Sequence, residues 1–327
     1  MKQKIRVAVV HKKSYNYFQP SHHDKTTYGF FVTALKQNSN LEMTYFPAEG
    51  TFDATKLRGK CDIILLTNND IDGTPDELAG IKKLEVPVIS RTGDSHYAKL
   101  HKQHEFHERW KIDYYFGVIP SSYFYKYYPK NFKYREIIFG LDPELYQNLK
   151  PFDKRIKEKI LNTGVMGNKK IKSRIANKLL NSGFSGWNLY KLRTLCNELP
   201  YVHYEGMKNG EYPFADNFPK YLSQYRAGIA ACTVYPVQKY WEMTAAGCLT
   251  FMEMTERNDG YYLGFKDGET VIFMNEKNYK NKFEEFLNDT DNNKWQEIAC
   301  AGREYVLNNL TNEKAANNLV NLMRELL

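Results

Sequence analysis

The stretch that decides the fold is KYWEMTAAGC at residues 239–248, which continues into LTFME at 249–253. It predicts a short helix, a glycine stop and an apolar strand. On a helix, Lys239, Glu242 and Ala246 share one face, because residues three and four positions apart are neighbours. That face presents a cation, a carboxylate and a small side chain, and Gly247 lets a ligand or another backbone come close.

Two interpretations of this segment fit its chemistry. A carboxylate can accept both cis-hydroxyls of a ribose, and an ammonium group can lie on a diphosphate as a point charge. The same residues also describe a solvated Lys239–Glu242 pair on an amphipathic helix that Gly247 caps. The chemistry alone favours the second interpretation.

The order of motifs in the C-terminal half resembles that of the GT-B glycosyltransferases. After the helix and strand come LGFKDGE at 263–269, VIF at 271–273 and AGREYVL at 301–307. This set is similar to the spore-maturation-type and group 1 branch, and it covers residues 155–327. The resemblance implies an α/β fold of two Rossmann-like domains whose parallel sheets face each other across a cleft. It also implies transfer of a sugar from a nucleotide-diphosphate sugar to an acceptor hydroxyl, with no metal and no further cofactor.

One position departs from the family pattern. Many relatives carry a second glutamate eight residues before the one that matches Glu242, and Val234 stands there in this chain. The resemblance therefore leaves open which sugar is carried and whether transfer retains or inverts its configuration.

Length and composition fit a two-domain protein of the cytoplasm. A chain of 327 residues suits two domains of about 150 residues each. The five cysteines are scattered and form no CxxC motif, which indicates reduced thiols rather than disulfides or a zinc site. The sequence contains no apolar run long enough for a transmembrane segment and no signal-peptide core.

The net charge of +8 favours a polyanionic partner. A nucleotide-sugar donor, a lipid headgroup and a nucleic acid all meet that description, and the charge also suits peripheral contact with an anionic surface. The acceptor hydroxyl can accordingly belong to a glycan, a lipid-linked compound or a nucleic acid. Two alternative functions stay open: a DNA-modifying glycosyltransferase that acts on a base, and a catalytically silent protein that binds sugar nucleotides or glycans.

Strand and helix signals alternate along both halves, which predicts parallel sheets covered on both faces. Apolar runs predict strands at 5–10, 41–46, 62–66, 86–89, 114–118, 134–139, 160–164, 201–204, 228–231 and 249–253. Helical signals occur at 28–35, 74–77, 171–180, 218–225 and 316–326. The segment at 74–77 reads as an N-cap followed by proline.

A polar, lysine-rich stretch at 149–159 is the predicted linker. We therefore expect an acceptor-binding Rossmann-like domain at 1–150 and a nucleotide-sugar-binding one at 151–327, with the C-terminal helix crossing back to the first. Open parallel sheets bind ligands at the carboxyl ends of their strands, so the linker predicts a cleft between two such edges.

On the acceptor side, Asp94 and His96 follow the predicted strand at 86–89. A carboxylate or an imidazole there can deprotonate an acceptor hydroxyl, and related enzymes often have an Asp-Ser-His triplet at this place. Asp94 can equally serve as the N-cap of the helix that follows. His23 and Asp24 come after the first strand, and we assign them to the acceptor side without a metal.

On the donor side, the segment GVMGNKK at 164–170 can cradle phosphate oxygens with backbone N–H groups at a helix start. In isolation it equally describes an ordinary basic loop. The family also has a glycine loop followed by an arginine on the next helix, which Arg174 matches. The predicted donor-binding residues are Gly164, Gly167, Lys169, Arg174, Lys239, Tyr240 and Glu242.

Overall fold

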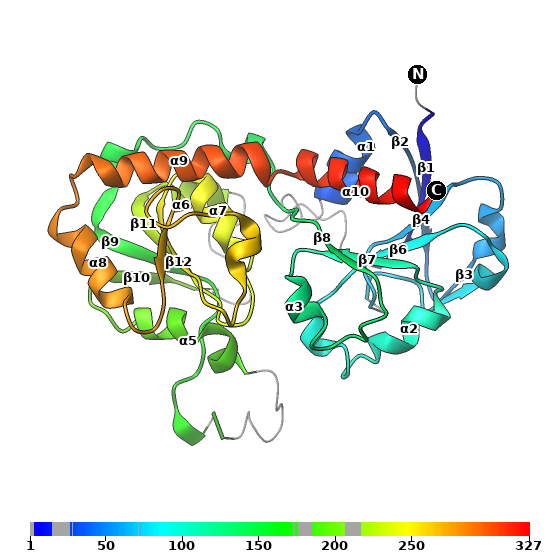
Figure 1. Cartoon of the computed structure of the whole chain (residues 1–327), viewed down its shortest axis with the longest axis horizontal. Helices are drawn as coiled ribbons and strands as arrows, with labels where there is room; N and C mark the ends of the chain where they lie inside the picture. Colours follow the sequence, from blue (N-terminus) through cyan, green and yellow to red (C-terminus); the bar gives the residue numbers. More distant parts are fainter. Residues whose placement is uncertain are drawn as a thin grey trace. The chain divides into compact units, whose positions relative to one another are not determined.

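The computed structural model describes residues 3–14, 27, 29–70, 72–172, 174–175, 185–206 and 217–327. The chain forms two compact units, and the boundary between them falls after Gly140. The first unit also includes Asn312–Leu327, at the other end of the chain. Each unit is built on a parallel sheet (Figure 1).

The first unit contains a six-stranded sheet in the order β2-β1-β4-β6-β7-β8, with every neighbouring pair parallel. Because β1 lies between β2 and β4, the chain winds in opposite directions from it, and a topological switch point lies at the carboxyl ends of β1 and β4. A small parallel pair, β3 and β5, stands apart from this sheet. The strands are β1 (Ile5–Lys12), β2 (Leu41–Ala48), β3 (Thr51–Asp53), β4 (Ile63–Leu66), β5 (Glu77–Ala79), β6 (Val88–Arg91), β7 (Tyr114–Gly117) and β8 (Tyr134–Glu136).

Short helices connect these strands. The described α-helices of the first unit are α1 (Leu35–Gln37), α2 (Gln103–Arg109), α3 (Ser121–Phe124) and α10 (Asn312–Leu326). A π-helix (Phe30–Ala34) precedes α1, and 3-10 helices occupy Ala54–Leu57, Ile81–Lys83 and Ser95–Tyr97.

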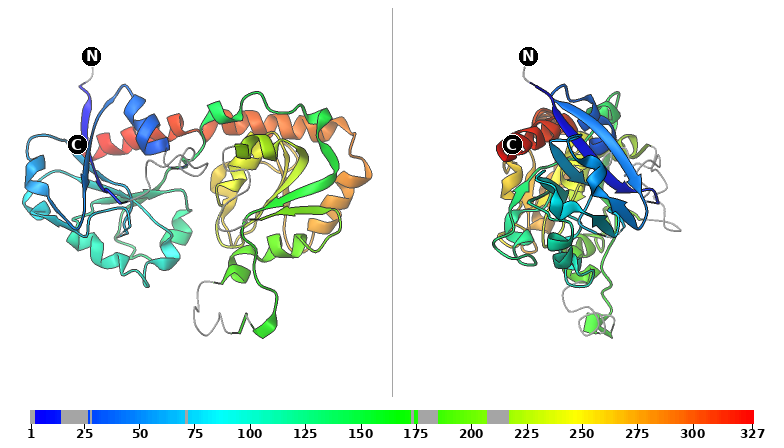
Figure 2. Two further views of the ribbon diagram at one scale, coloured as in Figure 1. Left: turned by 180° about the vertical axis from the view of Figure 1, so that it is seen from behind. Right: turned by 90° about the vertical axis from the view of Figure 1, so that its right-hand side faces the viewer.

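The last helix of the chain, α10, completes the core of the first unit. Its buried residues Leu319 and Met323 belong to the same apolar cluster as Val7, Phe31 and Leu35. Figures 1 and 2 show α10 in red beside α1 in blue. At its rim, Asn38 donates to Asn317, Arg324 donates to Asn40, and Arg135 pairs with Glu325.

The second unit contains a five-stranded parallel sheet in the order β10-β9-β11-β12-β13. Its switch point lies between β9 and β11, because the chain leaves β9 towards β10 on one side and returns to β11 on the other. The strands are β9 (Ile156–Thr163), β10 (Val202–Glu205), β11 (Tyr225–Ala230), β12 (Leu249–Glu253) and β13 (Ile272–Met274). The described helices are α5 (Gly186–Cys196), α6 (Phe218–Leu222), α7 (Lys239–Ala245), α8 (Tyr279–Asn288) and α9 (Asn293–Asn309), with 3-10 turns at Pro143–Tyr146, Phe152–Lys154 and Gly260–Leu263.

Helices cover both faces of the second sheet. On one face α7 lies so close to β11 that a Cβ atom on Gly228 would collide with Met243, and Thr244 bonds to Thr250 of β12. On the other face the ring of Phe283 from α8 packs edge-on against Phe251 of β12, with centroids 4.8 Å apart. The close packing of α7 on the sheet determines the positions of its charged residues, Lys239 and Glu242.

The predicted strands are observed with small shifts at their ends, whereas the predicted helix at 74–77 is wrong. Thr74 donates its hydroxyl to the carbonyl of Asn68 and caps no helix. Glu77–Ala79 instead forms β5, because it pairs with β3, and Gly80 then turns the chain at a φ of +77°.

The predicted linker at 149–159 is also shorter than expected. The strand β9 already begins at Ile156, whose amide donates to the carbonyl of Gln224. The predicted helix at 218–225 ends at Leu222, because Tyr225 already belongs to β11. Most of the predicted helix at 171–180 lies outside the described residues.

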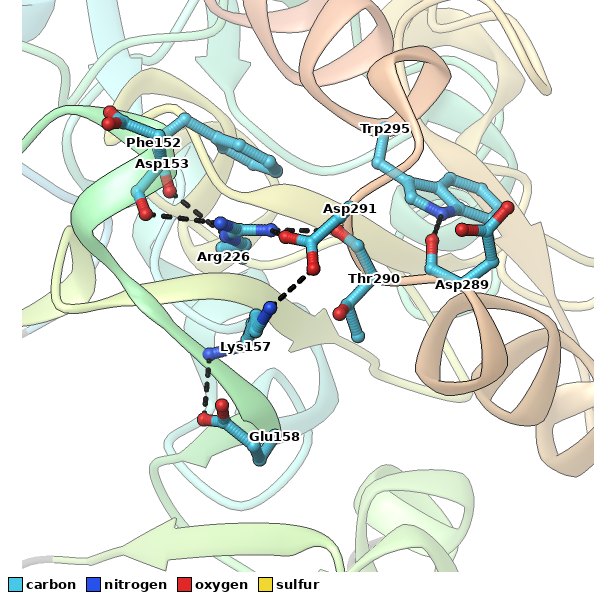
Figure 3. A network of polar contacts seen from close by, with 9 residues as sticks. All are labelled: Phe152, Asp153, Lys157, Glu158, Arg226, Asp289, Thr290, Asp291 and Trp295. Carbon is cyan, nitrogen blue, oxygen red and sulfur yellow. Dashed lines mark hydrogen bonds and ion pairs between the residues drawn. The ribbon is translucent and has the colours of Figure 1, made fainter.

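A buried arginine of β11 connects the segment that precedes β9 with the turn between α8 and α9 (Figure 3). Arg226, at the start of β11, donates to the carbonyl oxygens of Phe152, Asp153 and Thr290. It also donates to the carboxylate of Asp291 at 2.8 Å. The guanidinium group thus satisfies three backbone acceptors that its loss would leave without this donor.

We predict that Arg226→Leu lowers the free energy of unfolding by about 2–4 kcal/mol, because buried carbonyl groups lose their donors. Asp291→Asn is the matched control, and its effect should be much smaller, since the Asp291 side chain is 64% exposed and exposed ion pairs contribute little. Urea denaturation measures both. Equal losses in the two variants would mean that the ion pair, rather than the backbone contacts, stabilises this corner.

Candidate functional site

The carboxyl end of β9 lies at the switch point of the second sheet, and Gly164 follows it directly. Gly164 has a φ of +91°, which favours glycine. A Cβ atom there would lie 2.9 Å from Nζ of Lys239 and 3.2 Å from a guanidinium nitrogen of Arg193. Glycine therefore allows two cations to approach the backbone at this point.

Lys239 is the first residue of α7 and is buried, with 8% of its surface exposed. Its Nζ donates to the hydroxyl of Thr163 at the end of β9. Burial and, to a smaller extent, the positive charge of Arg193 lower the pKa of Lys239 to about 7, against the opposing effect of the Glu242 carboxylate. The ammonium group thus lacks full compensation within the folded chain.

Arg193 is the second cation, and it was not among the residues predicted from the sequence. It lies on α5 with 3% of its surface exposed, and its guanidinium group donates to the carbonyls of Ala231 and Val165. Its Nε finds no acceptor among the described residues. Neutral carbonyl groups solvate the arginine but do not neutralise it.

Two carboxylates belong to the same neighbourhood. Glu242, on α7, is 6% exposed and lies one helical turn from Lys239. Glu253, the last residue of β12, is 2% exposed, and burial raises its pKa to about 7 against the opposing charge of Arg193. Within the described chain no ion pair joins Glu253 to Arg193, and Oε2 of Glu253 has no hydrogen-bond partner.

Buried charges are costly unless they are paired, and two buried like charges repel each other as well. Lys239 and Arg193 place such a pair at a sheet edge where α/β proteins bind ligands. An anion bound beside them would relieve the repulsion and replace the lost solvation. A phosphate group carries a charge that such a pair of cations can stabilise.

The loop after Gly164 carries further predicted residues. Gly167 donates its amide to Thr194 of α5 at 2.8 Å, and a Cβ atom on it would lie 2.5 Å from Cα of Trp187. The guanidinium group of Arg174 stacks over the indole of Trp187 at 4.4 Å. Lys169 is ion-paired with Glu198 at the surface.

This loop borders an open hollow of about 480 Å³. Gly167, Lys169, Thr194 and Tyr204 are among the residues that line it. The hydroxyl of Tyr204 donates to the carbonyl of Gly164 at 2.9 Å. Gly164 therefore contacts both a residue that lines the hollow and the two cations. Its volume falls in the range of small-molecule sites.

Tyr240 is placed differently from the other predicted donor residues. It is fully buried, and its hydroxyl donates to the carbonyl of Glu253 and accepts from Asn258. These contacts are those of a core residue that fixes α7 to the end of β12.

In the first unit, Asp94 is exposed at the start of the 3-10 helix Ser95–Tyr97, and its side chain makes no capping bond there. His96 is partly buried, with Nδ1 3.4 Å from the hydroxyl of Tyr123. Burial lowers the pKa of His96, and the carboxylate of Asp94 opposes this shift. His23 and Asp24 lie outside the described residues.

Over the described part of the chain, no group of three or more His, Cys, Asp or Glu residues is arranged to hold a metal ion. Among the same residues, no helix combines the length and apolar character needed to cross a bilayer.

Comparison with known proteins supplies the class. Residues 176–321 match the model of a family described as glycosyl transferase-like, and no curated protein sequence matches the chain.

Several solved structures share the fold over nearly the whole chain. Sucrose-phosphate synthase from Thermosynechococcus elongatus is 12% identical with a TM-score of 0.60, covering 99% of both chains. An alpha-glucosyltransferase solved with UDP-glucose and DNA containing an abasic site is 9% identical with a TM-score of 0.58, covering 98% of this chain and 100% of that one. HepE from Anabaena, solved with UDP and glucose, is 10% identical with a TM-score of 0.54 and the same coverage.

Two Rossmann-like units with these strand orders define an α/β protein of the GT-B fold. The family match covers residues 176–321, and the likeness to these structures shows the GT-B fold over the whole chain. These findings confirm the predicted resemblance to GT-B glycosyltransferases, and the spore-maturation branch stays a prediction.

Because Lys239 carries its charge in a buried position, we expect it to lower the stability of the folded protein. Below pH 7 both the folded and unfolded states carry the charge, and the folded state bears the full burial penalty. Between pH 7 and the ordinary lysine pKa of 10.5 the unfolded state binds more protons, so stability should rise with pH. We expect Lys239→Met to melt at or above the wild-type temperature at pH 6, with a smaller difference at pH 9.

Thermal melts at the two pH values test this expectation. Lys191→Met is the matched control, because Lys191 is a surface lysine of α5 paired with Glu276, and its melting temperature should stay near wild type at both. A large loss of stability in Lys239→Met at pH 6 would show that the ammonium group supports the fold instead.

Proposed function

We propose that this glycosyltransferase binds a nucleotide-diphosphate sugar on its second unit, with the diphosphate on Lys239 and Arg193. The observation that carries the proposal is the buried cation pair at the switch point beside Gly164. As the sugar leaves, negative charge develops on the diphosphate, and two fixed cations in a dry site stabilise that charge strongly. UDP is the first nucleotide to test, since one of the similar structures holds UDP-glucose and another holds UDP.

The remaining donor residues take roles that follow from their places. Glu242 holds the ribose hydroxyls, since a carboxylate accepts two hydrogen bonds. Gly164 and Gly167 bring backbone close to the ligand, and Arg174 extends the positive charge along the loop. Lys169 is left out because Glu198 already pairs with it, and Tyr240 because its hydroxyl is bound within the core.

The proposal needs neither a metal nor a cofactor beyond the donor. Lys239 and Arg193 supply the charge that a divalent cation would otherwise bring to the diphosphate. The acceptor is a hydroxyl group presented to the first unit, with Asp94 and His96 as the residues that the sequence selects to deprotonate it. Four of the five cysteines are buried free thiols, in keeping with the cytoplasm.

We favour a glycan as the acceptor. The alternative is a nucleic acid, which the net charge of +8 would attract. Binding to DNA through phosphate contacts would weaken steeply as salt increases. Transfer to small glycans that is insensitive to salt would exclude the DNA-modifying alternative.

The proposed role of Lys239 makes donor binding depend on pH. Below pH 7 the ammonium group is already charged, and the diphosphate binds without taking up a proton. Above pH 7 binding must recruit that proton, so affinity should fall as pH rises, by up to about tenfold per pH unit. Calorimetry with UDP-glucose, whose diphosphate stays ionised over this range, should show proton uptake at pH 8 and none at pH 6.

Two comparisons make this measurement specific. Uridine lacks the diphosphate, so its affinity should not depend on pH, and Lys239→Met should abolish the pH dependence for UDP-glucose. A flat affinity from pH 6 to pH 9 in the wild-type protein would remove Lys239 from the diphosphate.

Glu242→Ala tests the ribose contact separately. We expect it to weaken UDP binding by about 1.5–3 kcal/mol, the range for hydrogen bonds to a charged group. Affinity for the 2′-deoxy nucleotide should change much less. A variant that binds both nucleotides as tightly as wild type would mean that Glu242 does not contact the ribose.

A further inference from the structure

A second polar cluster lies at the carboxyl edge of the first sheet, among residues that the sequence did not single out. Asp70 follows β4 beside the switch point, and His101 lies between the 3-10 helix Ser95–Tyr97 and α2. Oδ2 of Asp70 is 2.6 Å from Nδ1 of His101. The Asp70 side chain is 14% exposed and the His101 side chain 40%, so the pair opens to solvent through the imidazole.

This contact fixes the tautomer of the histidine. A carboxylate accepts hydrogen bonds and does not donate them, so Nδ1 of His101 carries the hydrogen. In the neutral ring the other nitrogen, Nε2, then has its lone pair available for a proton. Within the described residues no hydrogen bond reaches that nitrogen.

His101 is also fixed by Tyr97, which contacts both its ring and its backbone amide. The ring of Tyr97 stacks on it, with centroids 5.0 Å apart and an angle of 3° between the planes. The amide of His101 donates to the carbonyl of Tyr97 at 2.8 Å. Lys102 then adopts a φ of +52°, a left-handed conformation that non-glycine residues seldom take and that collects at functional sites.

A buried chain of hydrogen bonds positions the carboxylate. Gln103 donates to Oδ2 of Asp70 at 2.8 Å, and its own oxygen accepts from the hydroxyl of Tyr128. Asn69 donates to Tyr128 at 2.7 Å and accepts from the amide of Gly93 at 2.8 Å. The chain joins the loops after β4 and β6, and a satisfied buried network of this kind is rigid.

We propose that His101 is the general base that takes the proton of the acceptor hydroxyl, and that Asp70 is its positioning residue. This inference rests on the proposed glycosyl transfer. The acceptor oxygen bonds to the anomeric carbon of the sugar while the bond from that carbon to the diphosphate breaks, and the diphosphate leaves with the electron pair. The acceptor proton passes to Nε2, the carboxylate stabilises the imidazolium, and water then removes the proton.

His101 competes with Asp94 for this role. Asp94 is exposed at the start of a one-turn helix, whereas the imidazole of His101 is fixed in its plane by Asp70 and on its face by Tyr97. A base is effective when its orientation is set before the substrate arrives. The geometry therefore favours the histidine.

Kinetics of five variants test the assignment, using the nucleotide sugar that binds best in a panel of UDP, GDP, ADP, CMP and dTDP sugars. His101→Gln should lower turnover by about 10²–10⁴-fold without changing donor affinity. Asp70→Asn should lower kcat by a smaller factor at the same donor KM. His104→Gln is the matched control, an exposed histidine of α2 whose ring packs on Tyr128 but donates no hydrogen bond to Asp70, and it should turn over at the wild-type rate.

Two readouts separate a base from a merely structural residue. Added imidazole should restore turnover to His101→Gly and not to Asp70→Asn. Nitrogen NMR should show His101 protonated at Nδ1 in the wild-type protein and as mixed tautomers in Asp70→Asn.

Wild-type turnover in His101→Gln would overturn the assignment of the base, as would a collapse confined to Asp94→Asn. Loss of turnover in His101→Gly without rescue by imidazole would also count against it. A wild-type protein that binds the nucleotide sugars but transfers none of them, or that binds none, would instead overturn the proposed function.

Discussion

The second unit depends on one constraint, which is to keep two cations at the end of a buried strand. Lys239 and Arg193 approach the same turn of backbone, and Gly164 leaves the room that a Cβ atom would fill. Oxygen atoms of Thr163, Val165 and Ala231 receive their N–H groups. Apolar side chains in these places would give a more stable core, and the diphosphate of the proposed donor would offset that cost.

The larger features of the fold were predictable because each follows from a local pattern. Buried parallel strands appear as short apolar runs, and the KYWEMTAAGC segment at 239–248 became α7 and the turn before β12. Of the predicted donor-binding residues, Lys239 and Gly164 lie together at the end of β9, and Glu242 lies one turn further along α7. Tyr240 belongs to the same motif but faces the core. Its orientation could not be predicted, because every residue of α7 is buried and the pattern of apolar residues does not mark one face.

The remaining features depend on contacts between residues distant in sequence. Arg193 sits in an ordinary helix, and nothing in its neighbours reveals that it meets Lys239 from another element. The link between Asp70 and His101 spans 31 residues and two loops, with no motif to mark it. The residues at 74–77 have the composition of a helix N-terminus, yet Glu77–Ala79 forms a strand because it pairs with β3. Tertiary contacts override weak local preferences of this kind.

The position of α10 has a consequence for how the protein is made. The core of the first unit includes Leu319 and Met323, which are synthesised after the whole second unit. When β1 to β8 have emerged from the ribosome, part of the apolar cover of their sheet is still to be synthesised. The core of this unit is therefore complete only after α10 has been added. The second unit, continuous from Leu141 to Thr311, has no such dependence and can fold during synthesis. We infer that the N-terminal unit is the later of the two to become native.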